Sequence, residues 1–170
     1  PAKVIFTHNG GGTWSSTHDT ALPVNFDPSA IACVGSNLIV LSNADKSITY
    51  APIADIINGV ETWTRIATGL VGAPNALVSF GPNLTFIVGD TGYIYFSSDP
   101  TSGVTVQDAG TATVQDLVAI TGVDQNNLVA VGDSNAVVYT QSGGNVWASV
   151  TGQARGVDLL SVAMRSQTEW

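Results

Sequence analysis

The chain has 170 residues, of which 44% are hydrophobic and only 11% are charged. This length and composition are typical of one compact domain and argue against disorder. The formal net charge of −8, with only five lysines and arginines, excludes the basic surface that nucleic acids and anionic membranes require.

The opening segment, residues 1–17, predicts two short strands joined by a tight turn. The apolar run KVIFT and the run TWSST flank three glycines in the stretch FTHNGGGTW. Glycine adopts the positive φ angles that such a turn needs. A phosphate-binding loop would need a helix directly after the glycines, and TWSST is not a helical sequence. We therefore expect a hairpin.

Further along the chain, short alternating runs predict an all-β fold built from a repeated unit. The runs NLIVLS, NLTFIVG and NLVAVG superpose with Leu38, Leu84 and Leu128 in register, at separations of roughly 46 and 44 residues. Each is preceded by one apolar run and followed by two more, so that complete units are expected at 29–67, 75–107 and 115–150. Helical spacing is limited to residues 53–59, IADIING, which we expect to be an enlarged hairpin loop.

Four strands with a period in the low forties are typical of a β-propeller blade, with strands A to D running outward. Segment 1–17 then supplies strands C and D, and segment 157–170 supplies strand A and the start of B. We predict that these ends share one blade and close a four-bladed propeller, because an open sheet edge promotes aggregation. The alternative is a segment of a longer propeller, or a protomer that completes its ring with neighbouring copies.

The stretch FTHNGGGTW resembles the Asp-box, the bacterial neuraminidase repeat. Its pattern is filled by Thr7, Asn9, Gly11, Thr13 and Trp14. Degraded copies retain Thr62 and Trp63 in the second unit, Ser97, Asp99 and Gly103 in the third, and Thr140, Ser142, Gly144 and Trp147 in the last. The resemblance implies a structural role, in which the polar side chains close the hairpin and the tryptophan packs between blades. We therefore expect Trp14, Trp63 and Trp147 to be mostly buried.

The longer unit, which reads DLVAITGVDQNNLVAVGDSNAVVYTQSGGNVW, is similar to the repeat of Ycf48-like photosystem II assembly and stability factors. Repeats of this type also occur in bacteriophage structural proteins, and the similarity covers nearly the whole chain. It implies a non-catalytic, protein-docking propeller, which we interpret first as a virion component such as a capsid decoration, neck or tail protein. The alternatives are an assembly factor that binds another protein, and a glycan-binding module.

A glycan-binding module would use exposed aromatic rings that stack on sugars. The candidates are Tyr50, Tyr93, Tyr95, Trp147 and Trp170. Strand alternation explains most of these rings as packing residues instead.

Turns between strands B and C carry Asp45, Asp90 and Asp133 at matching positions. In propellers, these turns share a face with the D–A loops, and this face usually binds the partner. A ring of carboxylates can hold a cation, but Asp is also an ordinary turn residue and each turn brings only one. We therefore predict a binding face for a protein without a bound metal or cofactor.

The sequence does not predict an enzyme. Sialidases that share the Asp-box carry an arginine triad and a tyrosine nucleophile, whereas the arginines here are Arg65, Arg155 and Arg165, and Arg65 falls on an expected edge strand. Cys33 lies between apolar neighbours and is expected to be buried. No apolar stretch approaches the ~20 residues of a membrane helix and no leader precedes the first strand, so a virion or otherwise soluble location is expected.

Overall fold

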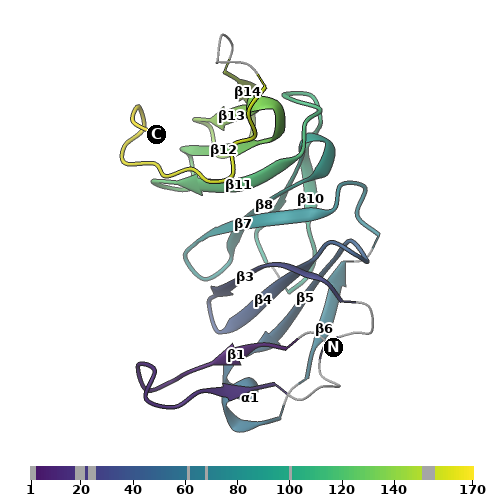
Figure 1. Ribbon diagram of the computed structural model, residues 1–170, viewed down its shortest axis with the longest axis vertical. Helices are drawn as coiled ribbons and strands as arrows, with labels where there is room; N and C mark the ends of the chain where they lie inside the picture. The colour runs from purple at the N-terminus through teal and green to yellow at the C-terminus, as the bar shows by residue number, and fades with distance from the viewer. Residues whose placement is uncertain are drawn as a thin grey trace.

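The computed structural model describes residues 3–17, 22, 26–60, 62–67, 69–99, 101–150 and 156–170. Four antiparallel sheets follow one another along the longest axis of the molecule (Figure 1). Three of them have four strands in chain order, and the N-terminal sheet has two. The predicted all-β fold with four-stranded antiparallel blades is confirmed.

The blades use consecutive strands A to D, and their A strands lie side by side. The N-terminal hairpin consists of β1 (Ile5–Phe6) and β2 (Ser15–Ser16). The first blade contains β3 (Pro28–Val34), β4 (Asn37–Ser42), β5 (Ser47–Pro52) and β6 (Thr64–Ala67). The second contains β7 (Pro74–Phe80), β8 (Leu84–Gly89), β9 (Tyr93–Ser97) and β10 (Thr105–Ala109). The third contains β11 (Leu117–Gly122), β12 (Leu128–Gly132), β13 (Val137–Thr140) and β14 (Ala148–Ser149).

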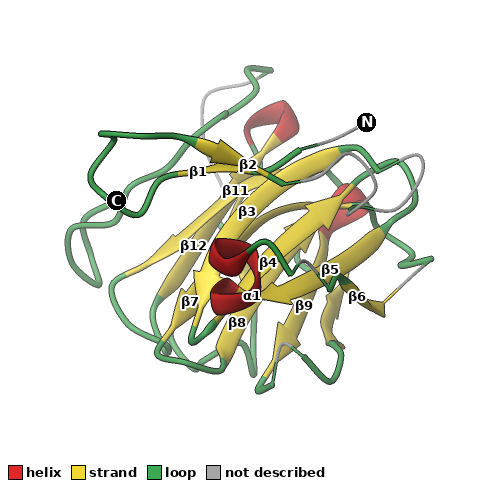
Figure 2. Ribbon diagram, turned by 90° about the horizontal axis from the view of Figure 1, so that it is seen from below, coloured by secondary structure: helices red, strands yellow, loops and turns green. Residues whose placement is uncertain are grey.

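One helix interrupts the first blade between strands C and D. Figure 2 looks along the stack from the end where this helix, α1 (Ile53–Asn58), lies near the N-terminal hairpin. We expected an enlarged hairpin loop here, and the segment is helical instead. Its Ile56 is buried against the first blade, and Gly59 ends the helix with a left-handed φ of 70°. Burial of one apolar face thus stabilises a helix that is too short to be stable alone.

Each blade has a rear face toward the preceding blade and a forward face toward the following one. Alternation along β4 illustrates this, since Leu38 and Val40 pack on the rear side with residues of the N-terminal hairpin. Ile39 and Leu41 pack on the forward side with Ile87 of the second blade. Because successive side chains of a strand point to opposite faces, one strand contributes to two clusters.

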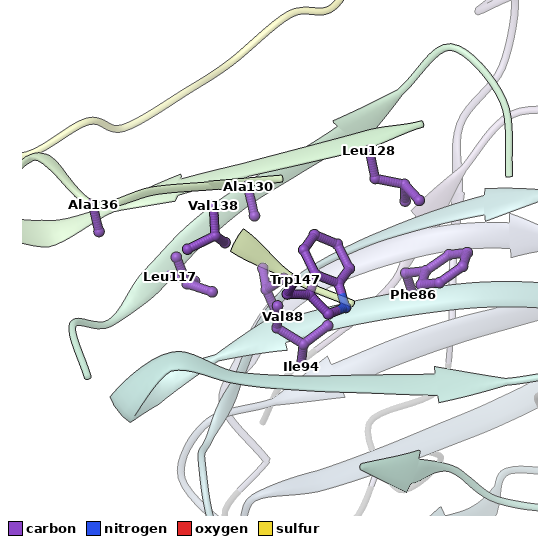
Figure 3. Close-up of a cluster of buried hydrophobic side chains, with 9 residues drawn as sticks. All are labelled: Phe86, Val88, Ile94, Leu117, Leu128, Ala130, Ala136, Val138 and Trp147. Carbon is purple, nitrogen blue, oxygen red and sulfur yellow. The ribbon is translucent and has the colours of Figure 1, made fainter. Parts of the chain in front are cut away.

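Figure 3 shows the seam between the second and third blades. The forward face of the second blade supplies Phe86, Val88 and Ile94, and the rear face of the third supplies Leu128, Ala130, Val138 and the indole of Trp147. Full burial of each large apolar side chain contributes about 1.5 to 3 kcal/mol. The cores of this molecule therefore lie between sheets.

The predicted superposition of the repeats is one residue out of register in the second blade. Strand A pairs with Ser42, Gly89 and Gly132 at the ends of the three B strands, which makes these positions equivalent. Leu38 and Leu128 are then equivalent, whereas the matching residue of the second blade is Thr85. The reason is that β8 contains one more residue between Leu84 and Gly89 than β12 contains between Leu128 and Gly132.

The prediction that both ends of the chain share one blade is wrong in this structure. Among the described residues, β1 and β2 pair only with each other, and they pack on the first blade through Val4 and Phe6. Residues 157–164 lie along the third blade at the other end of the molecule (Figure 1), where Val162 and Met164 pack on its forward face. Each blade packs on its neighbours in sequence, so the intervening complete blades separate the two ends.

The tryptophans of the hairpins differ in burial. Trp147 is 8% exposed and Trp63 is partly buried, as expected, but Trp14 is 64% exposed. Trp147 and Trp63 both lie in clusters with the preceding blade or hairpin. Trp14 belongs to the first sheet, and its rear face has no preceding sheet among the described residues. The expectation of burial failed because a seam needs two blades.

Cys33 is exposed, contrary to expectation. It lies on β3, where Ile31 is also exposed and Val34 is buried. Apolar neighbours in sequence predicted burial, but alternation along this innermost strand leaves one of its sides uncovered.

Trp147 and Trp14 form a matched pair for testing the seam, because they occupy the same position in the repeat. Trp147→Ala should lower the free energy of unfolding by about 3 to 5 kcal/mol, the usual cost of truncating a large buried aromatic side chain. Trp14→Ala should lower it by less than about 1 kcal/mol, since its ring is exposed. Urea unfolding in dilute solution, followed by circular dichroism, measures both changes. Equal losses in the two variants would contradict the assignment of Trp147 to a seam.

Candidate functional site

The first box hairpin is closed by its own polar side chains. Thr13 donates its backbone N–H to Asn9 Oδ1 at 2.9 Å, and Gly11 donates its N–H to Thr7 Oγ1 at 2.9 Å. The amide of Asn9 donates in turn to the hydroxyl of Thr13 at 2.8 Å. Gly10 and Gly11 have φ angles of 68° and 91°, which explains the glycine-rich sequence at this turn.

The last copy repeats this pattern with different residues. Gly144 donates its N–H to Thr140 Oγ1 at 3.1 Å, and Val146 donates its N–H to Ser142 Oγ at 3.1 Å. The Ser142 hydroxyl thus accepts the backbone hydrogen bond that the acidic residue accepts in the full box pattern. We infer a structural role for these hairpin residues, because the contacts run within the hairpin.

The middle copies depart further from the pattern. Asp99 accepts hydrogen bonds from the hydroxyls of Ser102 and Thr101, and these bonds lower the pKa of Asp99. Ser97 donates to the carbonyl of Gly103 at 2.6 Å. In the second copy Thr62 is exposed and Trp63 is partly buried.

The B–C turns lie at the opposite end of strand C from the box hairpins, because consecutive strands are antiparallel. Asp90 and Asp133 each begin a short 3-10 turn, at η1 (Asp90–Gly92) and η2 (Asp133–Asn135). The next residues, Thr91 and Ser134, have left-handed φ angles of 54° and 52°. Such a conformation costs a non-glycine residue about 1 kcal/mol or more, so other contacts must hold it.

Two further aspartates supply these contacts. Thr91 donates its N–H to Asp116 Oδ1 at 2.7 Å, and Ser134 donates its N–H to Asp158 Oδ1 at 2.9 Å. Each carboxylate comes from the segment that begins the following unit, so the bond joins two neighbouring units. Our sequence analysis did not single out these residues, although an Asp-Leu pair begins both of the last two A-type runs, at Asp116-Leu117 and Asp158-Leu159.

We define the acidic turn face as Asp90, Asp116, Asp133 and Asp158. Burial raises the pKa of Asp133, and the negative charges of Asp158, Asp116 and Asp90 raise it further. The contacts agree, since Asp133 donates its N–H to the Asp116 carbonyl at 2.9 Å and Asp158 accepts the N–H of the next residue, Ser134. In the part of the chain that the structure describes, no three potential ligand side chains are grouped to hold a metal ion. The surface presents negative potential over several turns, which suits a cationic segment of a partner.

Asp45 stands apart from the other two turn aspartates. Asn43 is the residue equivalent to Asp90, since both donate their N–H to the residue before strand A. Asp45 instead forms an ion pair with Arg65 at 2.6 Å. Burial acts to raise the pKa of Asp45, but hydrogen bonds from Ser47 and Ser42 and the charge of Arg65 outweigh it, so the pKa is lowered. These contacts favour a structural role for Asp45.

The aromatic residues considered for sugar stacking are mainly packing residues. Tyr95 is fully buried, and its hydroxyl accepts the N–H of Gly72 at 2.9 Å and donates to the Gly72 carbonyl at 3.0 Å. Tyr93 stacks on Tyr95, and Trp147 is buried in a seam. Tyr50 is partly buried in the seam between the first and second blades. Trp170 is the more exposed of these rings, and it stacks on Tyr139.

A shallow hollow of about 320 Å³ lies beside the third box hairpin, lined by Phe96, Asp99 and Thr105 among others. It lies away from the acidic turn face, and its polar groups are already used within the hairpin. None of the described helices is long and apolar enough to cross a bilayer.

Comparison with known proteins gives a fold likeness. No family model matches the sequence, and no curated protein sequence is significantly similar to it. Two similar solved structures are YCF48 bound to D1 peptide and YCF48 from Cyanidioschyzon merolae. The first has a TM-score of 0.62 at 17% identity over 81% of this chain, and the second has 0.61 at 18% over 88%. The likeness confirms the β-propeller fold. This chain spans 43% and 49% of those chains, less than half of their length.

The Asp45–Arg65 pair should stabilise the first blade in a pH-dependent way. At neutral pH, Arg65→Gln should lower the free energy of unfolding by about 1 kcal/mol, because it leaves a half-buried carboxylate without its partner. A carboxyl with a lowered pKa contributes stability above its ordinary value of 3.8 and loses it as the pH falls through the lowered pKa. The loss in Arg65→Gln should therefore shrink below pH 3.8.

Arg165→Gln is the matched control, since its ion pair with Glu169 is 3.7 Å long and highly exposed. Chemical unfolding over a range of pH values should show almost no change for this variant. If Arg65→Gln lowered the free energy of unfolding by the same amount at every pH, the Asp45–Arg65 ion pair would be excluded as the cause.

Proposed function

We propose that this chain is a non-catalytic β-propeller that binds a segment of another protein on its acidic turn face. The observation that carries the proposal is that Asp116 and Asp158 accept the N–H groups of Thr91 and Ser134, which sets their carboxylates beside the turn aspartates Asp90 and Asp133. Burial, and then repulsion by the other three carboxylates, raises the pKa of Asp133. A partner segment with lysine or arginine side chains relieves this repulsion when it binds.

The fold likeness favours the same function. One of the similar propellers was solved with a bound peptide, so this architecture accommodates a peptide ligand. The comparisons thus favour our alternative interpretation, an assembly or stability factor, over a bacteriophage virion component, for which they provide no support. The burial of Tyr95 and Trp147 argues against glycan stacking at those rings.

Asp133→Asn tests the proposal with little risk to folding. Folding raises the pKa of Asp133, so its ionisation disfavours the folded state; this cost grows as the pH rises from the ordinary pKa through the raised one and is present in full at neutral pH. Removing the charge should therefore leave stability at neutral pH unchanged or higher. Binding of a fluorescein-labelled lysine-rich peptide should weaken roughly three- to tenfold, the effect of one charge at an interface rim. Fluorescence anisotropy at low salt measures it.

Asp99→Asn is the matched control, because it removes the same charge from an exposed carboxylate at the opposite end of strand C. This variant should bind the peptide as the parent does. Binding should also weaken with added salt, and a glutamate-rich peptide should not bind. Equal affinities of the Asp133→Asn and Asp99→Asn variants would show that net charge alone attracts the peptide and would refute the proposed face.

A further inference from the structure

The loops that lead into strand A of a blade carry exposed valines. Val71 and Val114 each stand three residues before the first residue of the next strand A, in β7 and β11. Val71 is 66% exposed and Val114 is 70% exposed. Val157, which directly precedes Asp158 in the segment after the third blade, is 54% exposed. A single exposed apolar side chain is ordinary at a protein surface, but here the same loop exposes a valine in consecutive units.

Contacts with the B–C turns place these loops at one end of the blades. The Lys46 ammonium group, from the B–C turn of the first blade, donates to the Val71 carbonyl at 3.0 Å. The residue before Val114 lies against η1, because a Cβ on Gly92 would collide with the Thr113 carbonyl. The valines therefore belong to the same end of the blades as the acidic turn face.

Carboxylates of the acidic turn face flank two of the valines. Asp116 follows Val114 by two residues, and Asp158 directly follows Val157. Asp133 lies between these two aspartates, since its N–H bonds to the Asp116 carbonyl at 2.9 Å and the N–H of the next residue bonds to Asp158. An apolar side chain of a partner that packs on these valines displaces water from the carboxylates. Cationic groups beside it are needed to compensate the carboxylates, so the matching partner is both apolar and basic.

The valines come from successive units, so their spacing follows that of packed sheets. Packed sheets lie ~10 Å apart, and an extended chain advances ~3.3 Å per residue. One step from valine to valine therefore spans about three residues of an extended segment. A segment that crosses the blades can place an apolar side chain at each valine and lysine or arginine side chains at the carboxylates between them.

We propose that Val71, Val114 and Val157 form, together with the acidic turn face, a docking surface for an extended basic segment of a partner protein whose apolar side chains recur about every three residues. The inference rests on the proposed function and adds a sequence pattern to it. Lysine or arginine residues alone meet the carboxylates, whereas the spaced apolar residues meet the valines.

Three fluorescein-labelled peptides of equal charge test the pattern. The spaced peptide repeats Leu-Lys-Lys, the serine peptide repeats Ser-Lys-Lys, and the grouped peptide has the composition of the spaced one with all its leucines at one end. Fluorescence anisotropy at low salt measures the dissociation constants. The parent should bind the spaced peptide at least roughly tenfold more tightly than the serine peptide, because leucine side chains bury apolar surface on the valines. The grouped peptide should bind more weakly than the spaced one.

Val114→Ser removes one apolar contact without changing the charge. It should weaken binding of the spaced peptide roughly three- to tenfold and leave binding of the serine peptide unchanged. Val146→Ser is the matched control, because Val146 is 68% exposed and lies in the last box hairpin, at the opposite end of strand C. This variant should bind all three peptides as the parent does. Both side chains are exposed, so both variants should fold, and circular dichroism checks this.

Equal affinities of the parent for the spaced and serine peptides, or for the spaced and grouped peptides, would overturn the proposal. A Val114→Ser variant that binds the spaced peptide as the parent does would also overturn it. Asp133→Asn separates this failure from that of the proposed function. If Asp133→Asn weakens binding while Val114→Ser does not, the valines are refuted and the acidic turn face remains. If Asp133→Asn binds every peptide as the parent does, the acidic turn face is refuted and this inference with it.

Discussion

The packing of one blade's forward face on the next blade's rear face is the interaction on which the rest of this structure depends. A single sheet here has no core of its own, because alternation sends the side chains of β4 into two different clusters. Where both faces are covered, even the polar side chain of Thr85, near the start of β8, is fully buried. Where a face is left uncovered, as at Trp14, a residue of the same repeat position is exposed.

The same stacking creates the acidic turn face. Asp116 and Asp158 begin successive units and accept the N–H groups of left-handed residues in the preceding turns. Each carboxylate that secures a seam therefore also brings negative charge beside the turn aspartates Asp90 and Asp133. The surface that we propose for partner binding therefore forms only when consecutive blades are stacked in this order.

The sequence was sufficient to predict features that depend only on neighbouring residues in the chain, such as turns and strands. The glycines at 10 and 11 have the positive φ angles expected of a hairpin, and the strand runs fall close to the observed strands. Predictions failed where the outcome depends on a neighbouring unit. Trp14 lacks a preceding blade, and Cys33 lies on an uncovered side of β3. Asp45 differs from the other turn aspartates within its own blade, where it pairs with Arg65 of β6, the strand next to β5. Asp116 and Asp158 carry a repeated sequence signal, but their function requires the geometry across a seam.

Native-state amide hydrogen exchange tests the claim that seams carry the stability most directly. In dilute solution, the central strands β4, β8 and β12, covered on both faces, should exchange only through the largest openings of the molecule. The β1–β2 hairpin, covered on one face, should exchange at least roughly a hundredfold faster after correction for intrinsic rates. Equal protection of the hairpin and the central strands would contradict the account, because stability would then not require a covering blade on each face.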